Sequence, residues 1–123
     1  MFSGLADANR HLIDLARALR VDPDVVSVKQ RTEFRKYTDA PLLEGFVDAE
    51  LRSGKAVGCW FEIKFEGEDI QLHRSVRISH EQGEDILLEL PVVSVAITSM
   101  ETALPAALKE ICDRMIAIDL ASI

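Results

Sequence analysis

The stretch AVGCWFEIKF, residues 56–65, decides the fold. Every second position, beginning at residue 57, is apolar: Val57, Cys59, Phe61, Ile63 and Phe65. The alternate positions hold Gly58, Trp60, Glu62 and Lys64. A period of two residues is typical of a strand with one buried and one solvated face. The only tryptophan of the chain therefore lies on the face directed away from the core, beside a glutamate.

Two hairpins extend this strand into a sheet. A three-residue loop at 52–54, with Gly54 in the left-handed conformation, keeps the apolar faces of both strands together, whereas a two-residue loop would not. It pairs Ala49 with Val57, Val47 with Cys59 and Gly45 with Phe61. A two-residue loop at 67–68 does the same on the other side. It pairs Phe65 with Ile70, Ile63 with Leu72, Cys59 with Val76 and Val57 with Ile78.

The first strand, residues 25–37, is placed by charge. We predict three cross-strand pairs of opposite charge: Arg35 with Glu44, Arg31 with Asp48, and Lys29 with Glu50. Each such pair contributes about 0.2–1 kcal/mol. The same register lays Phe34 over Gly45 and Val28 beside Leu51.

The last strand is predicted at residues 85–91. Pro91 indicates a strand end or an edge strand, because proline cannot donate to a ladder. The apolar, β-branched residues 92–97 either extend this strand past a bend or form a separate short strand, and the pattern does not decide between them.

Helical periodicity flanks the sheet on both sides. The first apolar stripe is Leu5, Ala8, Leu12, Leu15, Ala16 and Leu19, and the second is Leu104, Leu108, Ile111, Cys112, Met115 and Ile118. The second helix is expected to begin near Thr102, so that Pro105 falls in its first turn, where proline is tolerated. The prediction is a single α+β domain, residues 1–123: an antiparallel meander of about five strands, with both helices packed on one face.

Composition excludes several classes of function. The net charge is −7 and the isoelectric point is near 4.9, so the chain repels phosphate backbones and anionic lipids. No nucleic acid and no membrane is expected as partner. No apolar run reaches a membrane span, and the first twelve residues lack the pattern of a signal peptide, so we expect a cytoplasmic protein. Cys59 and Cys112 are interpreted as small buried hydrophobes, and a bridge requires that their elements touch.

The predicted registers bring the polar positions together on the face away from the helices. One row reads Arg35, Glu44, Glu62 and His73; the next reads Glu33, Phe46, Trp60 and Ser75; the third reads Arg31, Asp48, Gly58 and Arg77. Three interpretations remain open. They are a solvated face, a recognition surface with an aromatic pair inside a charged rim, or an active site in which neighbouring carboxylates and His73 share a proton or hold a metal.

Arg74 breaks the alternation and falls on the core face opposite Phe61. It is interpreted either as an arginine at a layer boundary or as a charge inside a pocket between sheet and helices that takes an anionic ligand. None of the HExxH, CxxC, GxGxxG, P-loop or GxSxG motifs is present, so no enzyme, metal or cofactor is assigned.

The leading hypothesis is a small acidic protein–protein interaction module without catalytic activity: an adaptor, inhibitor, immunity protein or chaperone-like protein. It binds a protein partner or itself through the exposed sheet face, with Arg35, Glu44, Phe46, Trp60, Glu62 and His73 as candidate binding residues, or through an edge strand. The alternative is a small-molecule-binding domain or enzyme that uses a pocket near Arg74 or the face around Glu62 and His73.

Overall fold

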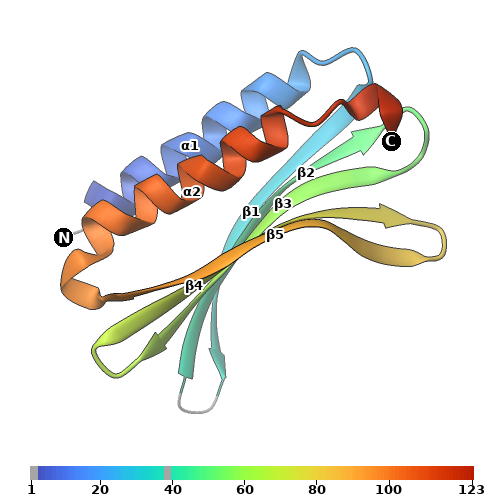
Figure 1. Ribbon diagram of the computed structural model, residues 1–123. Coiled ribbons are helices and arrows are strands. Elements are labelled where there is room, and N and C mark those ends of the chain that lie inside the picture. Colours follow the sequence, from blue (N-terminus) through green and yellow to red (C-terminus); the bar gives the residue numbers. More distant parts are fainter. Residues whose placement is uncertain (1–2, 38–39) are drawn as a thin grey trace.

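The chain forms a helix, five consecutive strands and a second long helix (Figure 1). The computed structural model describes residues 3–37 and 40–123; the side chains of residues 1–5 and 34–42 lie outside the described part. The elements are α1 (Ser3–Arg20), β1 (Val25–Tyr37), β2 (Ala40–Leu51), β3 (Ala56–Glu66), β4 (Asp69–His80), β5 (Gly83–Ala96) and α2 (Met100–Ile116), with short 3₁₀ turns at Ile97–Ser99 and Leu120–Ser122.

The strands follow one another in the order β1-β2-β3-β4-β5, each antiparallel to the next. Both helices lie side by side on one face of this twisted sheet (Figure 1). Their apolar stripes and the apolar face of the sheet form one buried cluster, which includes Leu12, Leu15, Ile63, Leu72 and Ile111. The predicted two-layer α+β architecture is confirmed.

The two hairpins around β3 have the predicted registers. Ala49 lies opposite Val57 and Cys59 lies opposite Val76. In the loop between β2 and β3, the Leu51 N–H donates to the Lys55 carbonyl at 2.8 Å. Gly54 has a φ of 91°, which residues with a side chain rarely adopt. Turn chemistry and apolar alternation therefore act together to place β2, β3 and β4.

The predicted register of β1 is wrong by two residues. Glu33, Arg31 and Lys29 lie opposite Glu44, Phe46 and Asp48, and Arg35 lies opposite Leu42 instead of Glu44. Likewise Phe34 lies opposite Leu43, and Val28 opposite Ala49. Tyr37 pairs with Ala40, whereas the predicted register would place Tyr37 opposite Leu42. A shift by an even number leaves the faces of a strand unchanged, so Val28 stays on the core face and Lys29 and Arg31 stay on the outer face.

Residues 92–96 continue the fifth strand instead of forming a separate one. Leu72 pairs with Val93 and Arg74 pairs with Leu90, so Pro91 and Val92 form an irregularity opposite His73. A second register shift lies between Val76 and Arg77. Proline at an irregularity of an edge strand agrees with the expectation for Pro91.

The second helix begins at Met100, two residues before the predicted start. Pro105 is therefore its sixth residue and not part of the first turn as we predicted. The missing proline N–H removes one helical hydrogen bond. The helix tolerates this loss because Leu104, Leu108 and Ile111 are buried against the sheet and α1.

Candidate functional site

The face of the sheet away from the helices, here called the outer face, has an aromatic centre. Phe46 of β2 and Trp60 of β3 are direct cross-strand partners. Their rings stack with centroids 5.3 Å apart and planes inclined by 20°. Both side chains are partly exposed, as expected for residues directed away from the core. The aromatic pair predicted from the alternation is therefore present.

A cation completes this centre. The guanidinium carbon of Arg77 on β4 lies 5.0 Å from the centroid of the Trp60 ring. Arg77 Nε donates to Ser75 Oγ at 3.0 Å, and Nη1 donates to Glu84 Oε1 at 3.1 Å. These contacts hold the arginine over the indole, an arrangement in which a cation and an aromatic face attract each other. We call Phe46, Trp60 and Arg77 the aromatic stack.

A row of carboxylates runs beside the aromatic stack. Glu33, Glu44 and Glu62 occupy directly paired positions on β1, β2 and β3. We predicted Arg35 at the β1 position of this row. Its backbone pairs with Leu42 instead, and its side chain lies outside the described residues. The observed register instead places Glu33 in this row, with its carboxylate 3.7 Å from the guanidinium of Arg31.

His73 ends the acidic row, directly opposite Glu62 as predicted. Its Nε2 atom is buried and has no hydrogen-bond partner in the structure. His73 occupies the position of β4 that faces the irregularity of β5. Within residues 3–37 and 40–123 no group of three or more histidine, cysteine, aspartate or glutamate side chains is arranged to hold a metal ion.

A second acidic group lies on the other side of the aromatic stack. The Asp48 carboxylate lies over Gly58 of β3. A β-carbon at residue 58 would come within 2.6 Å of Asp48 Oδ1, so the carboxylate occupies space that only glycine leaves open. Burial raises the pKa of Asp48; Lys29 lowers it, and the carboxylates of Glu84 and Glu50 raise it further. Carboxylates therefore border the aromatic stack on two sides, and two cations lie among them: Arg31, directly opposite Phe46, and Lys29, directly opposite Asp48.

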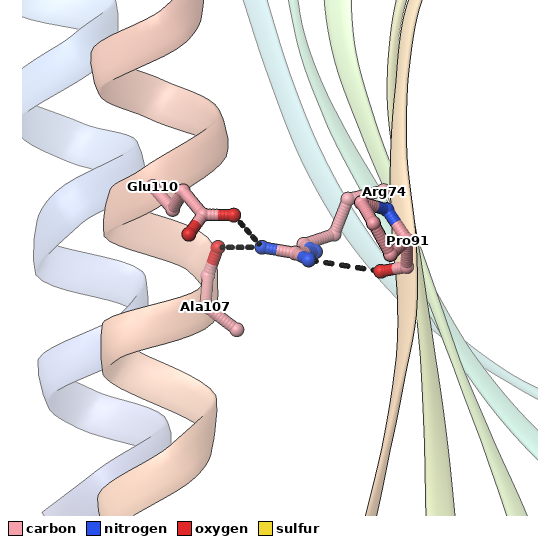
Figure 2. Close-up of polar contacts among 4 residues, drawn as sticks. All are labelled: Arg74, Pro91, Ala107 and Glu110. Carbon is pink, nitrogen blue, oxygen red and sulfur yellow. Dashed lines mark hydrogen bonds and ion pairs between the residues drawn. The ribbon is translucent and has the colours of Figure 1, made fainter.

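Arg74 lies opposite Phe61 on the core face, as predicted, and is almost completely buried. Figure 2 shows its guanidinium between α2 and β5. Nη1 donates to the Ala107 carbonyl at 3.0 Å and to Glu110 Oε1 at 2.9 Å, and Nη2 donates to the Pro91 carbonyl at 3.0 Å. Arg74 thus links the irregularity of β5 to the second helix.

A cavity of about 330 Å³ lies elsewhere between the helices and the sheet. Its described lining is Ala8, Asn9, Leu12, Thr32, Leu43, Phe61, Ile63, Leu104 and Leu108. No charged side chain is among these residues, and Arg74 does not line the cavity. Sequence reasoning missed it, because a gap between side chains of two helices and a sheet leaves no mark in a residue pattern.

The two cysteines meet inside the core. Cys59 of β3 and Cys112 of α2 are buried and free. The neighbouring Cys112 thiol, as a hydrogen-bond partner, and burial raise the pKa of Cys59 well above its ordinary value. The structure thus shows the contact between their elements that a bridge would require.

Comparison of the chain with models of protein families, with curated proteins and with solved structures finds no match. Across the described ranges, none of the helices combines the length and apolarity needed to cross a membrane. Fold and site together define an α+β domain with two helices on one face of the sheet and an aromatic stack among acidic and basic side chains on the other.

Proposed function

We propose that this protein is a small cytoplasmic protein–protein interaction module without catalytic activity, and that it binds a basic segment of a partner protein on its outer face. The observation that carries the proposal is the aromatic stack of Phe46, Trp60 and Arg77 on the outer face. Tryptophan and arginine are the residue types most enriched at the energetic centres of protein interfaces.

Charge supports a basic partner. Glu33, Glu44 and Glu62 border the aromatic stack on one side, and the whole chain carries a net charge of −7. Opposite charge on the partner accelerates the encounter and fixes its orientation, while the aromatic centre supplies the affinity. Such a surface would suit an adaptor, an inhibitor or immunity protein, or a chaperone-like protein.

The experiment is a pull-down from native lysate with the tagged wild type and Trp60→Ala, followed by measurement of the dissociation constant with the captured protein. Loss of an aromatic centre residue is expected to weaken binding about 30-fold or more, which corresponds to roughly 2 kcal/mol. The matched control is Ile116→Ala, which truncates an exposed apolar residue on α2, away from the outer face. The circular dichroism spectrum of both variants should equal that of the wild type.

A charge reversal tests the chemistry of the partner. Glu62→Lys places a cation in the acidic row and is expected to slow association and to reduce its dependence on salt. A captured protein that binds Trp60→Ala and Glu62→Lys as tightly as the wild type contradicts the proposal.

The apolar cavity favours a second candidate function, which is the binding of a small apolar molecule between the helices and the sheet. Its volume of about 330 Å³ suits a ligand with a short aliphatic or aromatic body. The probe is 1-anilinonaphthalene-8-sulfonate, whose fluorescence rises in apolar surroundings. Thr32→Phe, at the wall of the cavity, should abolish the signal, whereas Ser53→Phe in the exposed loop before β3 should not. A signal that persists in Thr32→Phe contradicts this function.

A further inference from the structure

The two edges of the sheet differ in charge. On β1, charged residues recur along the strand at Lys29, Arg31 and Glu33, a composition that discourages pairing with another strand. From Leu90 of β5 to Met100 at the start of α2, residues 90–100 (LPVVSVAITSM) include no charged residue. The backbone of β5 pairs only with β4 within the described sheet. A neutral, β-branched edge of this kind is a template for a further strand.

Exposed apolar side chains gather at the same edge. Seven large hydrophobic residues are exposed in the described part of the chain, and four of them lie on β5 or directly after it: Ile86, Leu87, Val92 and Ile97. On the core face, Val93 and Val95 are only half-buried, although their partners Leu72 and Ile70 are each 1% exposed. The hydrophobic core is therefore incompletely covered along β5.

We propose that two copies of this chain form a dimer by antiparallel pairing of residues 92–96 of β5. This segment extends from Val92, at the irregularity opposite His73, to Ala96, directly before the 3₁₀ turn that begins at Ile97, and its midpoint is Ser94. A two-fold axis at Ser94 places this serine opposite its copy, Val92 opposite Ala96, and Val93 opposite Val95. The five-stranded sheets of the two copies then form one continuous sheet.

The charge distribution of β5 favours a second copy in this orientation. The acidic residues Glu84, Asp85 and Glu89 all precede Leu90. In antiparallel pairing about Ser94, Glu89 faces the partner's Ser99, and the other two acidic residues lie farther from the axis, so no carboxylate opposes another. Pairing of β5 with the β1 edge of a second copy would instead be head-to-tail, which closes no dimer. The outer-face aromatic stack takes no part in this contact, so the dimer is independent of the proposed partner binding.

The experiment measures mass by light scattering after gel filtration, from low to high micromolar concentrations of the full chain. The wild type should approach twice 13.7 kDa at high concentration. Ser94→Lys and Ser94→Glu should each remain monomeric, because like charges then face each other at the axis. An equimolar mixture of the two should regain the mass of a dimer. Ser27→Lys, the same substitution at an exposed position of the opposite edge strand, should dimerise like the wild type.

A second measurement needs no substitution. Hydrogen exchange at the amides of residues 92–96 in the wild type should slow as the protein concentration rises, while exchange in β1 should not change. Three results would overturn the proposal: a wild type that is monomeric at every concentration, a Ser94→Lys variant that remains dimeric, or a dimer that Trp60→Ala abolishes and Ser94→Lys does not. Exchange at residues 92–96 that is independent of concentration would overturn it as well.

Discussion

Arg74 and Glu110 form an ion pair of 2.9 Å in which only the arginine is buried (Figure 2). The side chain of Arg74 is 3% exposed and that of Glu110 is 56% exposed. The two partners therefore depend on each other unequally. Without Arg74, the glutamate is left in water, whereas without Glu110 a buried cation is left with two neutral carbonyl groups, those of Ala107 and Pro91.

We predict that Glu110→Ala lowers the free energy of unfolding by about 1–3 kcal/mol. This is the range for losing a hydrogen bond to a charged group and leaving the buried charge without its partner. Arg74→Met should cost less than Glu110→Ala, because it removes the buried ion itself, although the carbonyl groups of Ala107 and Pro91 lose a donor. Urea unfolding measures both. Asp113→Ala is the control, since it removes an exposed pair with Lys109 on the same helix and should cost less than about 1 kcal/mol. A larger cost for Arg74→Met than for Glu110→Ala would contradict this asymmetry.

Gly45→Ala tests the close packing of β2 against Phe61. A β-carbon at Gly45 would lie 2.5 Å from Phe61 Cζ and 2.9 Å from the backbone oxygen of Arg31. We expect a loss of about 1–3 kcal/mol in the free energy of unfolding, because the ring is held in the core and cannot withdraw freely. Phe61→Leu in the Gly45→Ala background should restore part of this loss, since the clashing ring atoms are gone. Gly58→Ala should cost less, because the nearest atom belongs to the side chain of Asp48, and equal costs would contradict the prediction.

Asp48 predicts a pH dependence of stability. Burial raises its pKa above the ordinary value of 3.8; Lys29 opposes this shift, and Glu84 and Glu50 add to it. The protonated carboxyl therefore favours folding, an effect that is complete below pH 3.8 and lost as the pH rises through the higher pKa of the folded state. Asp48→Asn should be more stable than the wild type at neutral pH, and the difference should vanish in acid.

Urea unfolding of Asp48→Asn and the wild type across this pH range provides the measurement. Asp7→Asn, which removes one negative charge from the exposed Asp7–Arg10 pair on α1, is the control for the general effect of charge. A wild type more stable than Asp48→Asn at neutral pH would show that attraction to Lys29 outweighs the cost of burying the carboxylate.

The strands around β3 could be predicted because several constraints agree there. The alternation of residues 56–65, Gly54 in one turn and the two-residue loop after Glu66 each require the same registers, and a slip by one residue would expose Cys59 and Phe61. The aromatic pair of Phe46 and Trp60 followed directly from these registers. Fold class and the centre of the outer face were therefore accessible from sequence patterns.

The position of β1 was not accessible in this way. Charged residues alternate along it, so a shift by two residues still brings Lys29 opposite an acidic side chain, Asp48 in place of Glu50. Pairs of about 0.2–1 kcal/mol cannot decide between such registers. The partners of Arg74 were missed for another reason, since Glu110 and Pro91 approach it only when α2 packs on the sheet.

The aromatic stack should contribute to stability as a pair. In a double-mutant cycle of Phe46→Leu and Trp60→Leu, we expect a coupling energy of about 0.5–1.5 kcal/mol, the range for stacked aromatic rings beyond their buried area. Each single variant should remain folded, because both side chains lie on the outer face. A coupling energy near zero would contradict the stacked geometry, and an unfolded Trp60→Leu variant would contradict its place outside the core.

The thiols of Cys59 and Cys112 should be unreactive in the native protein. Both are buried, and the raised pKa of Cys59 keeps it as a thiol, while only the thiolate attacks disulfide reagents. We expect no reaction with 5,5′-dithiobis(2-nitrobenzoate) in native buffer, even at mildly alkaline pH, and reaction of both cysteines in guanidinium chloride. Ser53→Cys, in the exposed loop between β2 and β3, is the positive control and should react at once without denaturant. Fast native reaction of Cys59 or Cys112 would instead show that the buried layer between α2 and the sheet opens readily, because both cysteines lie in it.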